Sequence, residues 1–119
     1  MFTIYVYVLD TLADWEIGYV TAELKSGRFF KEDAPSVSLK TVSDSKEPVH
    51  TMGGLTIVPD CLVEDIVVSK TSVLLLPGAN TWNAPSRGAI MKKQANFYLL
   101  ALRYVQSVGL PLHLPALGY

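Results

Sequence analysis

Two short apolar runs constrain the fold of this chain most strongly. Phe2–Leu9 is hydrophobic apart from Thr3, and Ser72–Leu76 is hydrophobic after its first residue. Runs without polar alternation are typical of strands that are covered on both faces, as in a parallel sheet flanked by helices. Asp10–Thr11 breaks the first run, and Pro77–Gly78 closes the second. The sequence therefore predicts two buried strands of a parallel sheet.

The segments around these runs complete an alternating pattern. We expect a helix from Trp15 to about Ser26, with Asp14 as its N-cap and Gly27 at its end. The other expected elements are strands at Ser36–Ser43 and Leu55–Val58, a short helix at Cys61–Ile66 capped by Asp60, and a helix from near Pro85 through Leu102 or Val105. This order predicts an α/β three-layer sandwich with a mostly parallel sheet.

The composition excludes several classes of protein. The 119 residues suit one domain or most of one, and a net charge of -1 argues against a nucleic-acid-binding surface. No apolar run approaches the roughly 20 residues of a membrane span, and no basic n-region of a signal peptide is present, so we expect a cytoplasmic protein without membrane contact. The single cysteine, Cys61, excludes a Cys-rich zinc site. We expect neither a metal nor a cofactor, because no phosphate- or dinucleotide-binding motif occurs.

Three stretches together resemble a known family. These are Tyr5–Asp10, Ala13–Glu16 and Val73–Trp82, the last of which reads Val-Leu-Leu-Leu-Pro-Gly-Ala-Asn-Thr-Trp. Their order and spacing resemble the PfpI-like family of the glutamine-amidotransferase-like superfamily, and the resemblance covers about residues 1–91. It implies a flavodoxin-like sheet and descent from an intracellular cysteine protease, amidase or related hydrolase. The substrate of such a parent would be a small molecule or a peptide.

The resemblance also implies roles for three residues. Glu16 matches the acid that faces the family's nucleophilic cysteine and shares a proton with it. Gly78 and Ala79 match the Pro-Gly-Gly turn whose backbone N–H groups form an oxyanion hole, although Ala79 replaces the second glycine. The alternatives are an ordinary acid in the first turn of a helix and an ordinary turn at the end of a strand.

The other candidate residues suggest structural roles. Cys61 lies at an expected helix N-terminus, where a thiolate is stabilised, but we expect a half-buried structural cysteine. His50 and His113 have no acid at the spacing of a metal site or catalytic triad, so both are expected to be exposed or packed. Trp15 and Trp82 are expected to be packing anchors beside the site.

Residues 92–119 depart from the resemblance. The family's next strand delivers a cysteine nucleophile, and this segment contains none. Residues 110–119 also carry two prolines that fit neither a helix nor a central strand. One hypothesis is that a frameshift near Lys93 has replaced the catalytic half by an out-of-frame tail. The competing hypothesis is a natural short paralogue with a divergent tail.

The sequence therefore predicts a flavodoxin-like domain truncated before or at its nucleophile strand. We expect the chain to be inactive as it stands, and its exposed apolar faces would favour homo-oligomers. The alternatives are a small non-enzymatic interaction module and a pseudogene product.

Overall fold

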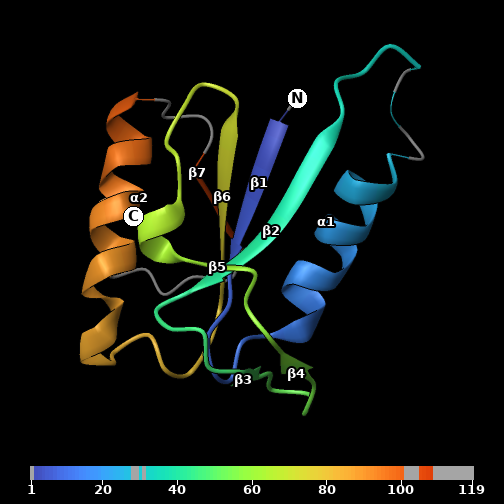
Figure 1. Cartoon of the computed structure of the whole chain (residues 1–119). Helices are drawn as coiled ribbons and strands as arrows, with labels where there is room; N and C mark the ends of the chain where they lie inside the picture. Colours follow the sequence, from blue (N-terminus) through green and yellow to red (C-terminus); the bar gives the residue numbers. More distant parts are fainter. Residues whose placement is uncertain (1, 28–29, 31, 101–104, 109–119) are drawn as a thin grey trace.

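A five-stranded sheet forms the centre of the molecule (Figure 1). The computed structural model describes residues 2–27, 30, 32–100 and 105–108, of which 96–100 and 105–108 are described as backbone only. The strand order is β5-β2-β1-β6-β7, and every neighbouring pair is parallel. The strands are β1 (Phe2–Tyr7), β2 (Val37–Ser43), β5 (Cys61–Leu62), β6 (Ser72–Pro77) and β7 (Val105–Val108). A separate antiparallel hairpin pairs β3 (Val49–His50) with β4 (Thr56–Ile57).

The two α-helices cover opposite sides of the sheet. Helix α1 (Asp14–Ser26) connects β1 to β2, and α2 (Gly88–Leu100) connects β6 to β7. The step from β1 to β2 and the step from β6 to β7 run toward opposite edges of the sheet. Right-handed crossovers in opposite directions place their helices on opposite faces, as Figure 1 shows. The predicted α/β three-layer sandwich with a parallel sheet is therefore confirmed. No helix in the described part of the chain has the length and apolar character needed to cross a membrane.

The core lies along β1 and β6, as the two apolar runs predict. The last four residues of each strand are buried, and the buried run of β1 continues through Leu9. Ile17, Val20 and Leu24 pack against this core from α1 at the spacing of one helix face, and Ile90 packs from α2. The absence of polar alternation in β1 and β6 thus reflects cover on both faces.

The ends of α1 match the prediction only in part. Gly27 ends the helix in the left-handed region, with φ of 63°, and its N–H donates to the Glu23 carbonyl at 3.1 Å. The N-cap prediction is wrong: Ala13 occupies that position, and Asp14 is the first helical residue. The Asp14 carboxylate instead accepts hydrogen bonds from the β3–β4 hairpin.

The predicted helix at Cys61–Ile66 is also wrong. Cys61–Leu62 forms the edge strand β5, and a single 3-10 turn, η1 (Val63–Asp65), follows it. Asp60 does not cap a helix, because its carboxylate accepts hydrogen bonds from the backbone N–H (2.8 Å) and hydroxyl (3.1 Å) of Thr41 in β2. This contact joins the residue before β5 to β2, next to which β5 pairs as the edge strand of the sheet.

The second long helix is shorter than predicted. A 3-10 turn, η2 (Pro85–Arg87), leads into α2, which ends at Leu100, and Val105 begins β7 rather than ending a helix. The boundary that we expected between residues 91 and 92 falls inside α2. Residues 101–104 and 109–119, the latter including His113, lie outside the described residues.

Candidate functional site

The order in which strands are added to the sheet reverses between β1 and β6, so their carboxyl ends form a topological switch point. The chain leaves β1 toward β2 on one side and leaves β6 toward β7 on the other. In open parallel sheets, ligands bind in the crevice that opens at such a switch point. Glu16, in the first turn of α1, and Gly78, directly after β6, both lie here.

Glu16 and Gly78 are in direct contact, 62 residues apart in sequence. The Gly78 N–H donates a hydrogen bond to Glu16 Oε1 at 3.2 Å, and the Gly78 carbonyl accepts one from the Ala13 N–H at 2.9 Å. Both polar groups of Gly78 are thus held by the residues around the start of α1. The structure brings together the acid and the turn that the sequence predicted as parts of one site.

Ala79 completes this turn without backbone strain. Among the described residues, positive φ angles occur at Thr11, Gly27 and Gly54, so an alanine is tolerated at position 79. The N–H of Ala79 has no hydrogen-bond partner within the described part of the chain, whereas the N–H of Gly78 is occupied by Glu16. Ala79 therefore has the freer of the two predicted oxyanion donors.

Thr11 is a strained residue at this site, and sequence reasoning missed it. Its φ of 67° lies in the left-handed region, which β-branched residues rarely adopt. Two contacts hold it: its N–H donates to the His50 carbonyl, and its hydroxyl accepts from the Asn80 N–H, both at 2.8 Å. Strained residues cluster at functional sites. The sequence indicated only a break after β1, since nothing local to Thr11 predicts its conformation.

A charged network, also missed from the sequence, lies beside the turn. Arg87 forms an ion pair with Asp44, and the Tyr7 hydroxyl donates to the same carboxylate oxygen at 2.8 Å. Arg87 also donates to the hydroxyl of Thr81 at 2.9 Å. Burial raises the pKa of Tyr7 well above its ordinary value, with a further contribution from its bond to Asp44, so the phenol keeps its proton. The network joins β1, the end of β2 and the turn that precedes α2.

The side chains of His50 and Cys61 do not contact Glu16, Gly78 or the Arg87–Asp44 pair. Cys61 is half-buried in β5, as expected from the sequence, and burial raises the pKa of its thiol. His50 is exposed on β3, where its ring lies 3.2 Å from the Thr56 hydroxyl. No group of three or more His, Cys, Asp or Glu side chains among the described residues could hold a metal ion.

The two tryptophans differ in their surroundings. Trp82 is 7% exposed, its ring centroid lies 5.4 Å from that of Tyr7, and its Nε1 donates to the Pro77 carbonyl, so it is the predicted packing anchor. The same prediction for Trp15 is wrong, because this side chain is 68% exposed. Position 15 lies on the solvent side of α1, whose core face is formed by Ile17, Val20 and Leu24.

Comparisons with known proteins identify the family of the chain. The sequence pattern of the DJ-1/PfpI family matches residues 2–97, which is most of the chain. The chain belongs to the DJ-1/PfpI family. A relative from Bacillus subtilis (strain 168), named "Uncharacterized protease YoaZ", is 40% identical over 116 residues, covering 98% of this chain and 55% of that protein.

Solved structures of the DJ-1/PfpI family show the same fold. A thiJ/pfpI family protein from Bacillus anthracis superposes with a TM-score of 0.79 at 36% identity, covering 90% of this chain and 51% of that one. A DJ-1 superfamily protein from Agrobacterium tumefaciens gives a TM-score of 0.72 at 22% identity, covering 90% and 53%, and shows the fold alone. The chain thus spans about half the length of the relatives that it matches.

Proposed function

We propose that this chain carries one half of a cysteine hydrolase or amidase centre of the DJ-1/PfpI type. The observation that carries the proposal is the hydrogen bond from the Gly78 N–H to the Glu16 carboxylate. This bond supports the proposal because it joins an acid to a strand-end turn at the switch point of the sheet, the part of an open parallel sheet where ligands bind. The name of the B. subtilis relative, a protease, supports the same class of reaction.

In the complete centre, each partner has a separate task. A cysteine thiolate attacks the substrate's carbonyl carbon, the bond to the leaving amine or alcohol breaks, and the leaving group takes up the proton that the thiol gave up. Water then hydrolyses the resulting thioester, which releases the carboxylic acid and returns the thiol. Glu16 acts as the acid partner that shares a proton with the thiol. The negative charge that develops on the carbonyl oxygen is stabilised by the backbone N–H of Ala79. The Gly78 N–H adds to this once it no longer donates its hydrogen bond to Glu16.

The 119 residues supply the acid and the amides but no suitable nucleophile. Their single thiol, Cys61, lies in the edge strand β5 and has a raised pKa, so it is not an activated thiolate. We therefore expect this chain alone to be inactive toward esters and amides, and the substrate of a complete protein to be a small molecule or peptide.

A hydrolysis assay with three matched chains tests this proposal. The purified chain, Cys61→Ala and Glu16→Gln are each mixed with activated acyl esters and short peptides, and product is followed above the uncatalysed rate. All three are expected to show the same background, and Cys61 is expected to react with iodoacetamide no faster than a free thiol. Turnover by the unaltered chain that disappears in Cys61→Ala would overturn the proposal.

A further inference from the structure

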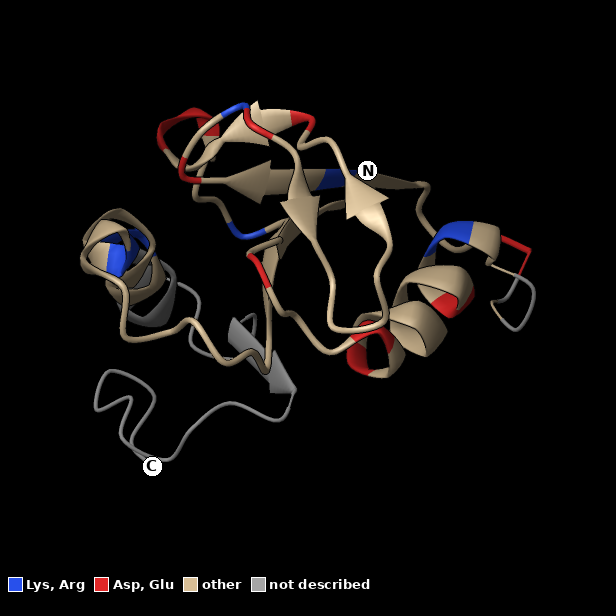
Figure 2. Ribbon diagram, turned by 90° about the horizontal axis from the view of Figure 1, so that it is seen from below, with Lys and Arg blue, Asp and Glu red and all other residues tan. Residues whose placement is uncertain are grey.

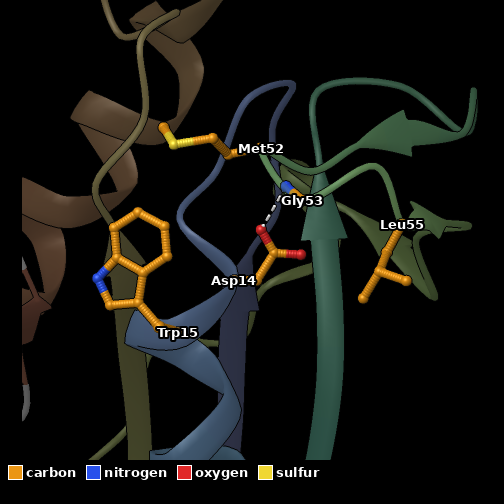
Figure 3. A pocket seen from close by; sticks show the side chains of 5 residues that line it. All are labelled: Asp14, Trp15, Met52, Gly53 and Leu55. Atoms are coloured by element: carbon orange, nitrogen blue, oxygen red, sulfur yellow. Dashed lines mark hydrogen bonds between the residues drawn. The ribbon is translucent and has the colours of Figure 1, made fainter.

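A pocket of about 550 Å³ lies where the start of α1 meets the β3–β4 hairpin. Five residues line it: Asp14, Trp15, Met52, Gly53 and Leu55. Figure 3 shows Trp15 and Met52 on one side of the Asp14 side chain and Leu55 on the other. None of these residues is Glu16 or Gly78, although Asp14 and Trp15 directly precede Glu16 in α1.

The pocket gathers large apolar side chains that water reaches. Trp15 is 68% exposed, Leu55 63% and Met52 45%. They make up three of the seven large hydrophobic side chains that are exposed in the described part of the chain, so exposure is concentrated here rather than scattered. Clustered apolar exposure of this kind marks a binding surface more often than isolated exposed residues do.

A fixed carboxylate lies among these side chains. The Thr51 hydroxyl donates to Asp14 Oδ2, and the Gly53 N–H donates to Asp14 Oδ1 at 2.8 Å. The bond from Thr51, followed by that from Gly53, holds the pKa of Asp14 below its ordinary value, so the carboxylate stays charged at neutral pH. Among the residues that the structure describes, no ion pair neutralises Asp14.

The surrounding charge is negative as well. The first turn of α1 carries Asp14 and Glu16, whereas the basic residue of this helix, Lys25, is in its last turn (Figure 2). The N-terminus of a helix carries about half a positive charge, and the two carboxylates outweigh it. An indole face and an unneutralised carboxylate both attract organic cations.

We propose that this pocket binds an organic ammonium group, with the cation placed against the Trp15 ring and Met52 and attracted by Asp14. The hairpin supplies Met52 and fixes Asp14, so the site exists before any ligand arrives. This proposal does not depend on the hydrolase chemistry, because it requires neither the bond between Glu16 and Gly78 nor a cysteine.

Choline and its neutral isostere 3,3-dimethyl-1-butanol test the charge requirement. Calorimetric titrations of the purified chain at low ionic strength are expected to show choline binding and much weaker binding of the alcohol, because only choline gains from the ring and the carboxylate. Equal affinities for the two compounds, or no choline binding at all, would overturn the proposal.

Matched variants test the location. Trp15→Ala is expected to weaken choline binding by about two- to fivefold, the range of an exposed cation–π contact, whereas Tyr19→Ala, which removes an aromatic ring 71% exposed on the same helix, leaves it unchanged. Asp14→Asn is expected to weaken binding as well. Thr51→Val, which removes one of the bonds that fix Asp14 but keeps the charge, should have a smaller effect. Equal losses in Trp15→Ala and Tyr19→Ala would exclude this pocket.

Discussion

At the scale of single residues, a glycine and a largely buried ion pair show how closely segments distant in the sequence approach one another. Gly53 is the clearest example, because a Cβ placed there would lie 2.9 Å from Asp14 Oδ2. Real Cβ atoms do not approach an oxygen so closely, so any side chain at position 53 would displace the Asp14 carboxylate. The glycine pair in the sequence therefore marks a close approach between the hairpin and α1.

Two glycine-to-alanine variants of opposite sign test this account. Gly53→Ala is expected to lower the free energy of unfolding, because the added methyl group displaces the Asp14 carboxylate from the bonds that it accepts. Gly18→Ala, within α1 and with open space around the added methyl, is expected to raise it by about 0.5–1 kcal/mol. Urea unfolding of both variants gives the values. A Gly53→Ala chain as stable as the original would contradict the close approach.

The Arg87–Asp44 pair offers a second prediction at this scale. Their side chains are 12% and 16% exposed, so Arg87→Gln leaves a largely buried carboxylate without its cation. Breaking a buried pair costs about 3–5 kcal/mol, and the remaining bond from Tyr7 reduces this to about 2–4 kcal/mol of unfolding free energy. Lys92→Gln, at an exposed position, should change it by less than about 0.5 kcal/mol. Similar stabilities of the two variants would show that the ion pair carries little energy.

At the scale of elements, the proposed ammonium pocket depends on the contact between the β3–β4 hairpin and the start of α1. Asp14 is the link, since it accepts bonds from Thr51 and Gly53 while its own backbone begins the helix. The hairpin consists of two strands of two residues each, which are too short to be stable alone. We infer that its position is fixed by this anchor.

The anchor should respond to acid. The pKa of Asp14 is lower in the folded chain than in the unfolded one, so its stabilisation is complete above the unfolded value of about 4 and is lost as pH falls through the folded value. In Asp14→Asn, the part of the stability change between pH 7 and pH 3 that is due to Asp14 should disappear. Unfolding curves of both chains across this range test it, and parallel pH profiles would contradict the anchor.

How far the sequence predicts each element depends on whether the cause is local. β1, β6 and the end of α1 were predicted because their apolar runs and Gly27 act within a few residues. The strand β5 was not, because Asp60 bonds to Thr41, 19 residues away. The same reason hides the Arg87–Asp44 pair, 43 residues apart, and the strain at Thr11. Glu16 and Gly78 could be predicted only through resemblance to a family.

At the scale of the whole molecule, the fold places the predicted acid and turn at the sheet's switch point, and the chain spans about half the length of its DJ-1/PfpI relatives. The frameshift near Lys93 stays a prediction. The family pattern matches up to residue 97, whereas the similarity to the B. subtilis protein extends over 116 residues. Sequencing the gene through the codons of Lys92–Tyr119 and beyond is expected to reveal the codon of the family's nucleophilic cysteine in a shifted frame, and its absence would favour a short paralogue.

The most direct test of the central claim is the chemical shift of the Gly78 backbone amide proton, measured by nuclear magnetic resonance at neutral pH. If Glu16 Oε1 accepts the Gly78 N–H, replacing Glu16 by alanine removes the acceptor, and the Gly78 amide proton should move upfield. Glu64→Ala, which changes an exposed acid on η1, should leave the Gly78 resonance in place. A Gly78 resonance that stays in place in Glu16→Ala, or that moves equally in both variants, would contradict the contact between Glu16 and Gly78.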